Sequence, residues 1–120
     1  MDATVLQATF VGKRSFVHPL ATIGVSIIGD DCLIGKCVDI GDEVIIGHRV
    51  EIRDYCKIPR GTIIMDDAFL GRGVEIVYDT VDSSHPTDMT FIGQCTQIMR
   101  NVRIFAGTFI PAYRVIGATP

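Results

Sequence analysis

The sequence lacks tryptophan, has few aromatic residues and contains no long apolar run. Aromatic residues make up 8% of the 120 residues, whereas hydrophobic residues make up 48%. Polar residues interrupt the apolar ones every few positions, so no stretch approaches the roughly 18 residues that a membrane-spanning helix needs. The N-terminal sequence MDATVLQATF has an early acid and no basic segment, unlike a secretory signal peptide. We therefore expect a soluble, cytoplasmic protein with no membrane partner.

Clusters of positive charge and paired cysteines are also missing. The 11 Lys and Arg residues are scattered, and the formal net charge is −3. A nucleic-acid-binding domain usually has a basic face, so we expect no nucleic-acid partner. The four cysteines, Cys32, Cys37, Cys56 and Cys95, form no CxxC pair. We expect them to be small buried or turn residues in a reducing compartment rather than zinc ligands.

A six-residue repeat fills almost the whole chain. An aliphatic residue stands at every sixth position from Ile28 to Ile76 and again from Ile92 to Ile116. Upstream, the same spacing places Val5, Val11, Val17 and Ile23, with one residue missing before Ile28. Neither the 3.6-residue period of a helix nor the two-residue period of a lone strand explains this repeat. It indicates a solenoid in which a short strand and a turn recur three times in each triangular coil.

Two further positions of the repeat are also restricted in residue type. The residue directly after it is a glycine in nine repeats: Gly12, Gly24, Gly29, Gly35, Gly41, Gly47, Gly71, Gly93 and Gly117. Four residues after it comes a small or β-branched residue, such as Thr62 or Val74. We expect the aliphatic residue to point inward, the small residue to fit the corner, and glycine to allow turn dihedrals that a Cβ would penalise. The prediction is one all-β domain over residues 1–120, with about six triangular coils.

Repeats eighteen residues apart share a face of this prism, provided that residues 82–91 are a ten-residue insertion. The residues that point outward on one face are then all large and apolar: Phe10, Ile27, Ile45, Ile63, Phe91 and Phe109. A second face has the solvated set Thr4, Thr22, Asp39, Lys57, Glu75 and Arg103. An unbroken apolar column is rarely left exposed on a soluble protein, so we expect self-association through the first face.

The insertion DSSHPTDMTF is where we expect function, because it is the long excursion from a uniform solenoid. His85 is its one group that exchanges protons near neutral pH. Asp82 and Asp88 lie three residues to either side, so either could orient one ring nitrogen and leave the other as a general base. Ser83 and Ser84 could be nucleophiles but would need a separate oxyanion hole. The alternative is a polar loop in which His85 is incidental.

The stretch HPTD, followed by TFIGQCTQIMRNVRIFAGTFIPAYRVIGA, resembles the hexapeptide-repeat acyltransferases, notably the maltose and galactoside O-acetyltransferases and serine acetyltransferases. The resemblance implies a left-handed parallel β-helix and a homotrimer with a cleft between subunits. It also implies acetyl-CoA, or another acyl-CoA, as cofactor and a small-molecule acceptor. By this resemblance His85 is the base and Asp82 or Asp88 its orienter. The small residues Ala106, Gly107 and Ala112 would line the pantetheine arm of the cofactor.

Two other interpretations stay open. A carbonic-anhydrase-like metal site would use His18, His48 and His85 between subunits, although the three are 30 and 37 residues apart and form no H-x4-H pair. The other interpretation is a non-catalytic trimeric scaffold or small-ligand binding protein, whose loop only bounds a cleft.

Overall fold

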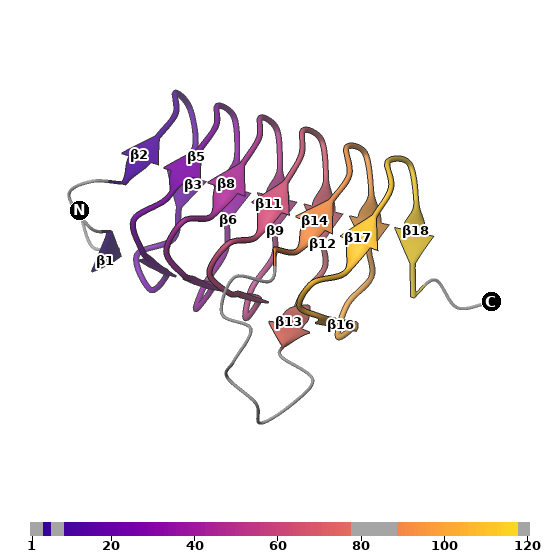
Figure 1. Ribbon diagram of the computed structural model, residues 1–120. Coiled ribbons are helices and arrows are strands. Elements are labelled where there is room, and N and C mark those ends of the chain that lie inside the picture. Colours follow the sequence, from indigo (N-terminus) through magenta and orange to yellow (C-terminus); the bar gives the residue numbers. More distant parts are fainter. Residues whose placement is uncertain (1–3, 6–8, 78–88, 118–120) are drawn as a thin grey trace.

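The computed structural model describes residues 4–5, 9–77 and 89–117 and builds them from eighteen strands. Each strand is two or three residues long, and tight corners of three or four residues join most of them. The coils stack side by side along one axis, from the N-terminal end to the C-terminal end (Figure 1). Because this part of the chain contains no helix, it has no helical segment long and apolar enough to cross a membrane.

The strands form three parallel sheets, each with one strand from every coil. Sheet A consists of β1 (Thr4–Val5), β4 (Thr22–Ile23), β7 (Asp39–Ile40), β10 (Lys57–Ile58), β13 (Glu75–Val77) and β16 (Arg103–Phe105). Sheet B consists of β2 (Phe10–Val11), β5 (Ile27–Ile28), β8 (Ile45–Ile46), β11 (Ile63–Ile64), β14 (Phe91–Ile92) and β17 (Phe109–Ile110). Sheet C consists of β3 (Phe16–Val17), β6 (Leu33–Ile34), β9 (Glu51–Ile52), β12 (Phe69–Leu70), β15 (Gln97–Ile98) and β18 (Val115–Ile116). The three sheets confirm the predicted triangular solenoid. Six strands in each sheet correspond to about five full turns, slightly fewer than the six coils predicted.

The pairing register confirms the predicted faces. In sheet B, Ile63 pairs with Ile45 on one side and with Phe91 on the other. The first partner is 18 residues away and the second is 28, so the insertion is ten residues long and the register continues beyond it. Phe91, the last residue of the predicted insertion, is itself the first residue of β14.

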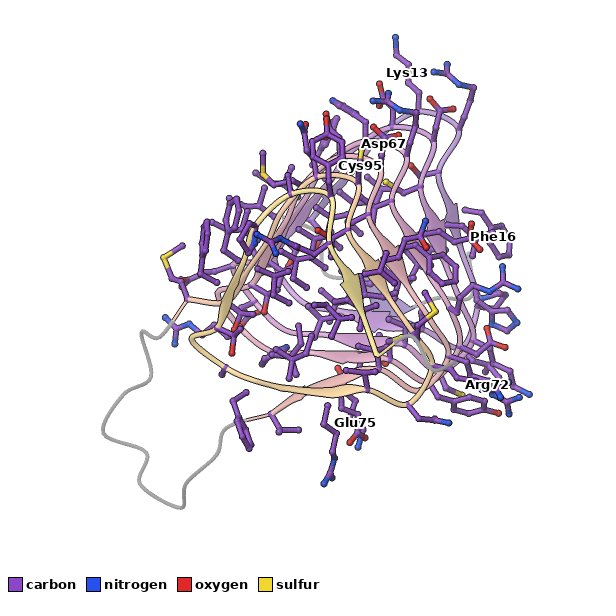
Figure 2. The ribbon with its side chains drawn as sticks, turned by 90° about the vertical axis from the view of Figure 1, so that its right-hand side faces the viewer. Lys13, Phe16, Asp67, Arg72, Glu75 and Cys95 are labelled. Atoms are coloured by element: carbon purple, nitrogen blue, oxygen red, sulfur yellow. The ribbon has the colours of Figure 1, made fainter. Side chains whose placement is uncertain are left out.

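The coil is left-handed. Seen from the C-terminal end, the chain runs clockwise from Lys13 to Phe16 and from Arg72 to Glu75 (Figure 2). It approaches the viewer as it does so, because the C-terminal coils lie nearest. Generic crossover connections between parallel strands are right-handed, so this fold is an exception to that rule.

The core is a stack of the inward aliphatic residues. Ile28, Ile34, Ile52, Ile64 and Ile92 are each 0% exposed. Burying one such side chain contributes about 1.5–3 kcal/mol relative to leaving it in water. The corner residues complete the packing: Thr62, Thr96 and the thiol of Cys56 are also fully buried. The hydroxyl of Thr62 donates to the carbonyl of Pro59 at 2.8 Å, so its burial leaves no polar group unpaired.

Glycine recurs for a different reason from the one predicted. The left-handed backbone conformation falls two residues after the glycine position, at residues such as Arg14, Asp31 and Arg49. Among the repeat glycines that the structure describes, only Gly117 has a positive φ. A Cβ on Gly29 would lie 2.5 Å from the carbonyl oxygen of Gly47 in the next coil. Glycine is needed there because neighbouring coils approach closely, and the prediction about turn dihedrals was wrong.

Both irregularities of the repeat fall at the corner between sheets A and B. The insertion joins β13 of sheet A to β14 of sheet B. The missing residue lies between β4 and β5, which also join sheet A to sheet B. That corner has three residues, Gly24 to Ser26, and lacks the position that is left-handed at the next two corners of the chain, at Asp31 and Cys37. The corner between sheets A and B therefore changes length while the sheets keep their register.

Candidate functional site at the corner between sheets A and B

Neighbouring coils hydrogen-bond to the described residues nearest the insertion on both of its sides. On the incoming side, Val77 pairs with Phe105, and its carbonyl accepts a hydrogen bond from the amide of Ala106 at 2.7 Å. On the outgoing side, Thr90 is 1% exposed, and its carbonyl accepts from the amide of Ile63 at 2.8 Å. The backbone on both sides of the loop is therefore hydrogen-bonded to neighbouring coils.

Thr90 is a site residue that sequence reasoning missed. Its hydroxyl oxygen accepts a hydrogen bond from the amide of Gly107 at 3.0 Å, and Gly107 has a φ of 90°. This bond fixes the turn directly beside the insertion. The signal was present, because Thr90 precedes a strand in the same way as Thr62 and Thr108 and so occupies the corner position of the repeat.

The structure separates the three predicted cofactor-binding residues. Ala106 and Gly107 lie between β16 and β17, at the corner between sheets A and B, beside the ends of the insertion. Ala112 follows β17 and lies at the corner between sheets B and C. Two of the three are thus together, and the third lies at the opposite edge of sheet B. His85, Asp82 and Asp88 lie outside the described residues, as do Ser83 and Ser84.

At this corner itself the guanidinium of Arg60 is 2.9 Å from the carboxylate of Glu43, and a second group of paired charges lies beside it on sheet A. Glu75 of β13 is 3.2 Å from Nε of Arg103 and 3.7 Å from Nζ of Lys57. These three residues form the alternating outer column of sheet A, which Figure 2 shows along the lower side at Glu75. The carboxylates of Glu75 and Glu43 are therefore both held in ion pairs.

The two described histidines bind backbone amides. Nδ1 of His48 accepts from the amide of Asp30 at 2.8 Å, in the position where Asp66 accepts from the amide of His48 at 2.8 Å. Nδ1 of His18 accepts from the amide of Leu20 at 3.0 Å. Within the described ranges, no three His, Cys, Asp or Glu side chains gather so as to hold a metal ion. Both histidines therefore have a role in shaping corners.

The buried cysteines are poor candidates for nucleophiles. Burial raises the pKa of the Cys56 thiol to about 11 and also raises the pKa of Cys32. The Cys56 thiol instead donates to the carbonyl of Gly71 at 3.1 Å. A thiol must lose its proton to attack, so these two remain inert at neutral pH. This agrees with the predicted structural role of the cysteines.

Four of the six side chains in the apolar column of sheet B are exposed in the isolated chain. Phe10 is 62% exposed, Ile27 is 52%, Ile45 is 46% and Phe109 is 66%. The rings of Phe91 and Phe109 stack with centroids 5.0 Å apart and planes inclined by 13°. Phe91 and Phe109 are the first residues of β14 and β17, directly after the corner between sheets A and B. The apolar face and the insertion therefore share this edge of sheet B.

No protein-family model and no curated protein matches the sequence. Solved structures do match. A mutant of perosamine N-acetyltransferase from Caulobacter crescentus, in complex with CoA and GDP-perosamine, has a TM-score of 0.59 at 12% identity, covering 95% of this chain and 49% of that one. The acetyltransferase domain of PglB from Neisseria gonorrhoeae has a TM-score of 0.43 at 19% identity, covering 91% and 46%. UDP-N-acetylglucosamine acyltransferase from Campylobacter jejuni has a TM-score of 0.41 at 15% identity, covering 95% and 65%.

The chain thus spans about half the length of the first two proteins. The match to the perosamine enzyme shows a shared fold, in agreement with the fold that the repeat and the resemblance predict.

Proposed function

We propose that the chain is an acetyl-CoA-dependent acyltransferase that acts on the hydroxyl or amino group of a small acceptor. The observation that carries this proposal is the single ten-residue insertion, placed beside an exposed apolar face and flanked by the small residues Ala106 and Gly107. The fold is shared with an N-acetyltransferase whose structure contains CoA, and the HPTD stretch resembles the catalytic loop of hexapeptide-repeat acyltransferases.

A homotrimer built through sheet B would complete the site. If three copies turn their sheet B faces toward a threefold axis, each copy brings one edge of that face against the opposite edge of its neighbour. The corner between sheets A and B, with Ala106 and Gly107, then faces the neighbour's corner between sheets B and C, with Ala112. The proposed arrangement explains why one chain separates residues that would line one cleft.

The thin pantetheine arm fits this cleft because its proposed walls are small. Ala106 and Gly107 carry no bulky side chain, and at the other corner a Cβ on Gly93 would lie 2.4 Å from the amide nitrogen of Ala112. The bound coenzyme supplies the acetyl group as a thioester. His85 removes the proton from the acceptor hydroxyl or amine, and Asp82 or Asp88 holds the other ring nitrogen in the correct tautomer. A positioned base of this kind accelerates a reaction by about 10²–10⁴-fold.

Thermal unfolding with acetyl-CoA tests the binding step. A ligand that binds only the native state stabilises it by mass action, by about 2.7 kcal/mol at 100 times its Kd. We expect acetyl-CoA to raise Tm, and an unchanged Tm at millimolar acetyl-CoA would favour the non-catalytic scaffold instead.

Acetyl transfer to a panel of amino and hydroxyl sugars tests the chemical step. We expect His85→Ala to lower the rate by about 10²–10⁴-fold while the Tm shift with acetyl-CoA persists. His18→Asn is the matched control, because asparagine can still accept from the amide of Leu20. An equal loss of acetyl-transfer rate in both variants would contradict the role of His85. Stoichiometric zinc in the wild type that is absent from His85→Ala would support the metal site instead.

A further inference from the structure

We propose that the chain also binds a small organic phosphate in a groove at the corner between sheets C and A. The groove has a volume of about 710 Å³ and is lined by Arg53, Arg72 and Arg100, together with Phe69 and Met99. Small-molecule sites in proteins span about 300–1,000 Å³. This inference does not depend on the proposed acyltransferase activity.

Charged residues that stack in neighbouring coils normally alternate in sign in this protein. On sheet A the outer column runs Asp39, Lys57, Glu75 and Arg103. At the corner between sheets B and C, Arg14 is 2.6 Å from Asp31, and Arg49 is 2.8 Å from Asp67. Alternation is expected, because opposite charges on neighbouring strands stabilise a sheet and like charges destabilise it.

The corner between sheets C and A breaks this rule once. Its column runs Lys36, Asp54, Arg72 and Arg100, so the last two neighbours are both positive. Their alignment follows from the pairing of Leu70 with Ile98, two residues before each arginine. Within residues 9–77 and 89–117, neither Arg72 nor Arg100 has a carboxylate oxygen within 4.0 Å. An anion bound in the groove would offset these two like charges on neighbouring coils.

The arginines differ in how they are held. The guanidinium of Arg53 pairs with Glu51 and is already neutralised. The guanidinium of Arg72 lies 5.3 Å from the ring centroid of Tyr55, a cation–π contact that orients the group and leaves its N–H donors available. Arg72 and Arg100 are both exposed. A planar guanidinium binds phosphate through two parallel hydrogen bonds, so this pair suits a phosphate or diphosphate group.

The remainder of the groove suits the organic part of such a ligand. Phe69 and Met99 are half-buried and present apolar surface beside the arginines. Gly71 between them cannot carry a side chain, since its Cβ would lie 2.6 Å from the amide nitrogen of Arg100. The floor of the groove at Gly71 is therefore formed by backbone atoms. A flat ring stacks favourably on an aromatic side chain, so a nucleoside phosphate has the required chemistry.

The groove lies at a different corner from the candidate active site. Seen along the axis, Arg72 lies at one end of the sheet that contains Glu75 (Figure 2). The insertion joins sheet A to sheet B at the other end. The corner between sheets C and A is also the one that sheet B does not touch. Association through sheet B would therefore leave the groove open.

Isothermal titration with GDP at low ionic strength tests the proposal. GDP is the probe because it carries a diphosphate and a purine, and coenzyme A contains no guanine. We expect GDP to bind, and guanosine and pyrophosphate to bind more weakly. Arg100→Gln should weaken GDP binding at least about tenfold, because charge-assisted hydrogen bonds are lost. Arg114→Gln, an exposed arginine outside the groove, is the matched control and should change affinity less than about twofold.

The Tm without ligand provides a second measurement. Because Arg100→Gln removes a like-charge neighbour, it should leave Tm unchanged or raise it. A lower Tm in this variant would overturn the argument from repulsion. No GDP binding at 5 mM, or equal GDP affinity in the wild type and Arg100→Gln, would overturn the site. Pyrophosphate binding as tightly as GDP would overturn the organic-phosphate assignment.

Discussion

At the scale of single residues, the corners are stabilised by side chains that reach into the next coil. Arg49 donates two hydrogen bonds to the carboxylate of Asp67, at 2.8 and 3.2 Å. These bonds lower the pKa of Asp67 below its usual value of 3.8. Arg14 and Asp31 form the same pair two coils earlier, with the pKa of Asp31 also lowered. One corner thus contains repeated acid–base pairs that depend on pH.

The Arg49–Asp67 pair predicts acid sensitivity. The carboxylate has a lower pKa in the folded state than in the unfolded state, so its stabilisation is complete above about pH 3.8. It is lost as the pH falls through the lower folded-state value. We expect Asp67→Asn to lower Tm at pH 7 and the difference from wild type to vanish in strong acid. Thermal melts from pH 7 to pH 2 measure this.

The matched variant is Asp39→Asn, an exposed aspartate on sheet A. It should change the pH profile less than Asp67→Asn does. A difference between Asp67→Asn and wild type that persists undiminished at the lowest pH would contradict the ion-pair explanation.

At the scale of strands and corners, the repeat places each residue type by the space available rather than by propensity alone. The inward position is aliphatic because it stacks on its copies, and the position after it is glycine where the next coil leaves no room for a Cβ. The left-handed position accepts Arg, Asp, Cys, Glu, Tyr and Asn as well as glycine. At the corners, the glycine position therefore restricts the residue type more strongly than the left-handed position does.

Two glycine substitutions separate these effects. Gly29→Ala places a Cβ 2.5 Å from the carbonyl oxygen of Gly47, and backbone has to move. We expect a loss of about 1–3 kcal/mol in the free energy of unfolding, measured by urea denaturation. Gly61→Asn occupies a position with a φ of 81°, equivalent to Glu43 one coil earlier. It should cost less than about 1 kcal/mol, because asparagine tolerates this conformation.

The reverse order of the two costs would show that dihedral preference, and not the approach of neighbouring coils, sets the glycine pattern.

The strands and their faces could be predicted because a period of six fixes both the direction of each side chain and its neighbour in the next coil. Counting from Ile64 to Ile92 even gave the length of the insertion. The reason for glycine could not be predicted, because the sequence does not reveal how closely coils approach. The Arg72–Arg100 pair was missed for a related reason, since it becomes visible only when the columns of each corner are compared for charge.

The candidate site was predictable only in part. Ala106 and Gly107 lie beside the insertion as expected, but Ala112 lies at the other edge of sheet B. Small residues recur at every corner of this fold, so their presence alone does not say which corner they occupy. Thr90 was missed because it was counted as part of the insertion rather than as a corner residue of the repeat.

At the scale of the whole molecule, the proposed trimer explains why sheet B exposes large apolar side chains to solvent. Phe10, Ile27, Ile45 and Phe109 are about half to two-thirds exposed in one chain. The neighbouring faces carry charges in alternating columns or a mixture of polar and apolar residues. A patch of this kind on one of three faces indicates an interface between copies.

Ile45→Asp tests that interface, because a carboxylate at the centre of the column has to lose its water on association. We expect a wild-type trimer and a folded Ile45→Asp monomer by light scattering after size exclusion. Gln97→Asp, at an exposed position on sheet C between Phe69 and Val115, should remain a trimer. An unchanged trimer in Ile45→Asp, or a monomeric wild type, would contradict the assignment.

The corner between sheets A and B omits one residue in an early coil and gains ten in a later one, and the strands on both sides stay in register. This tolerance makes the corner a grafting position. A foreign peptide placed between Gly24 and Ser26 would start from the same corner as the natural insertion, three coils away from it. In a trimer, such a graft would be displayed three times around one axis, at a spacing set by the prism and independent of the graft's own sequence.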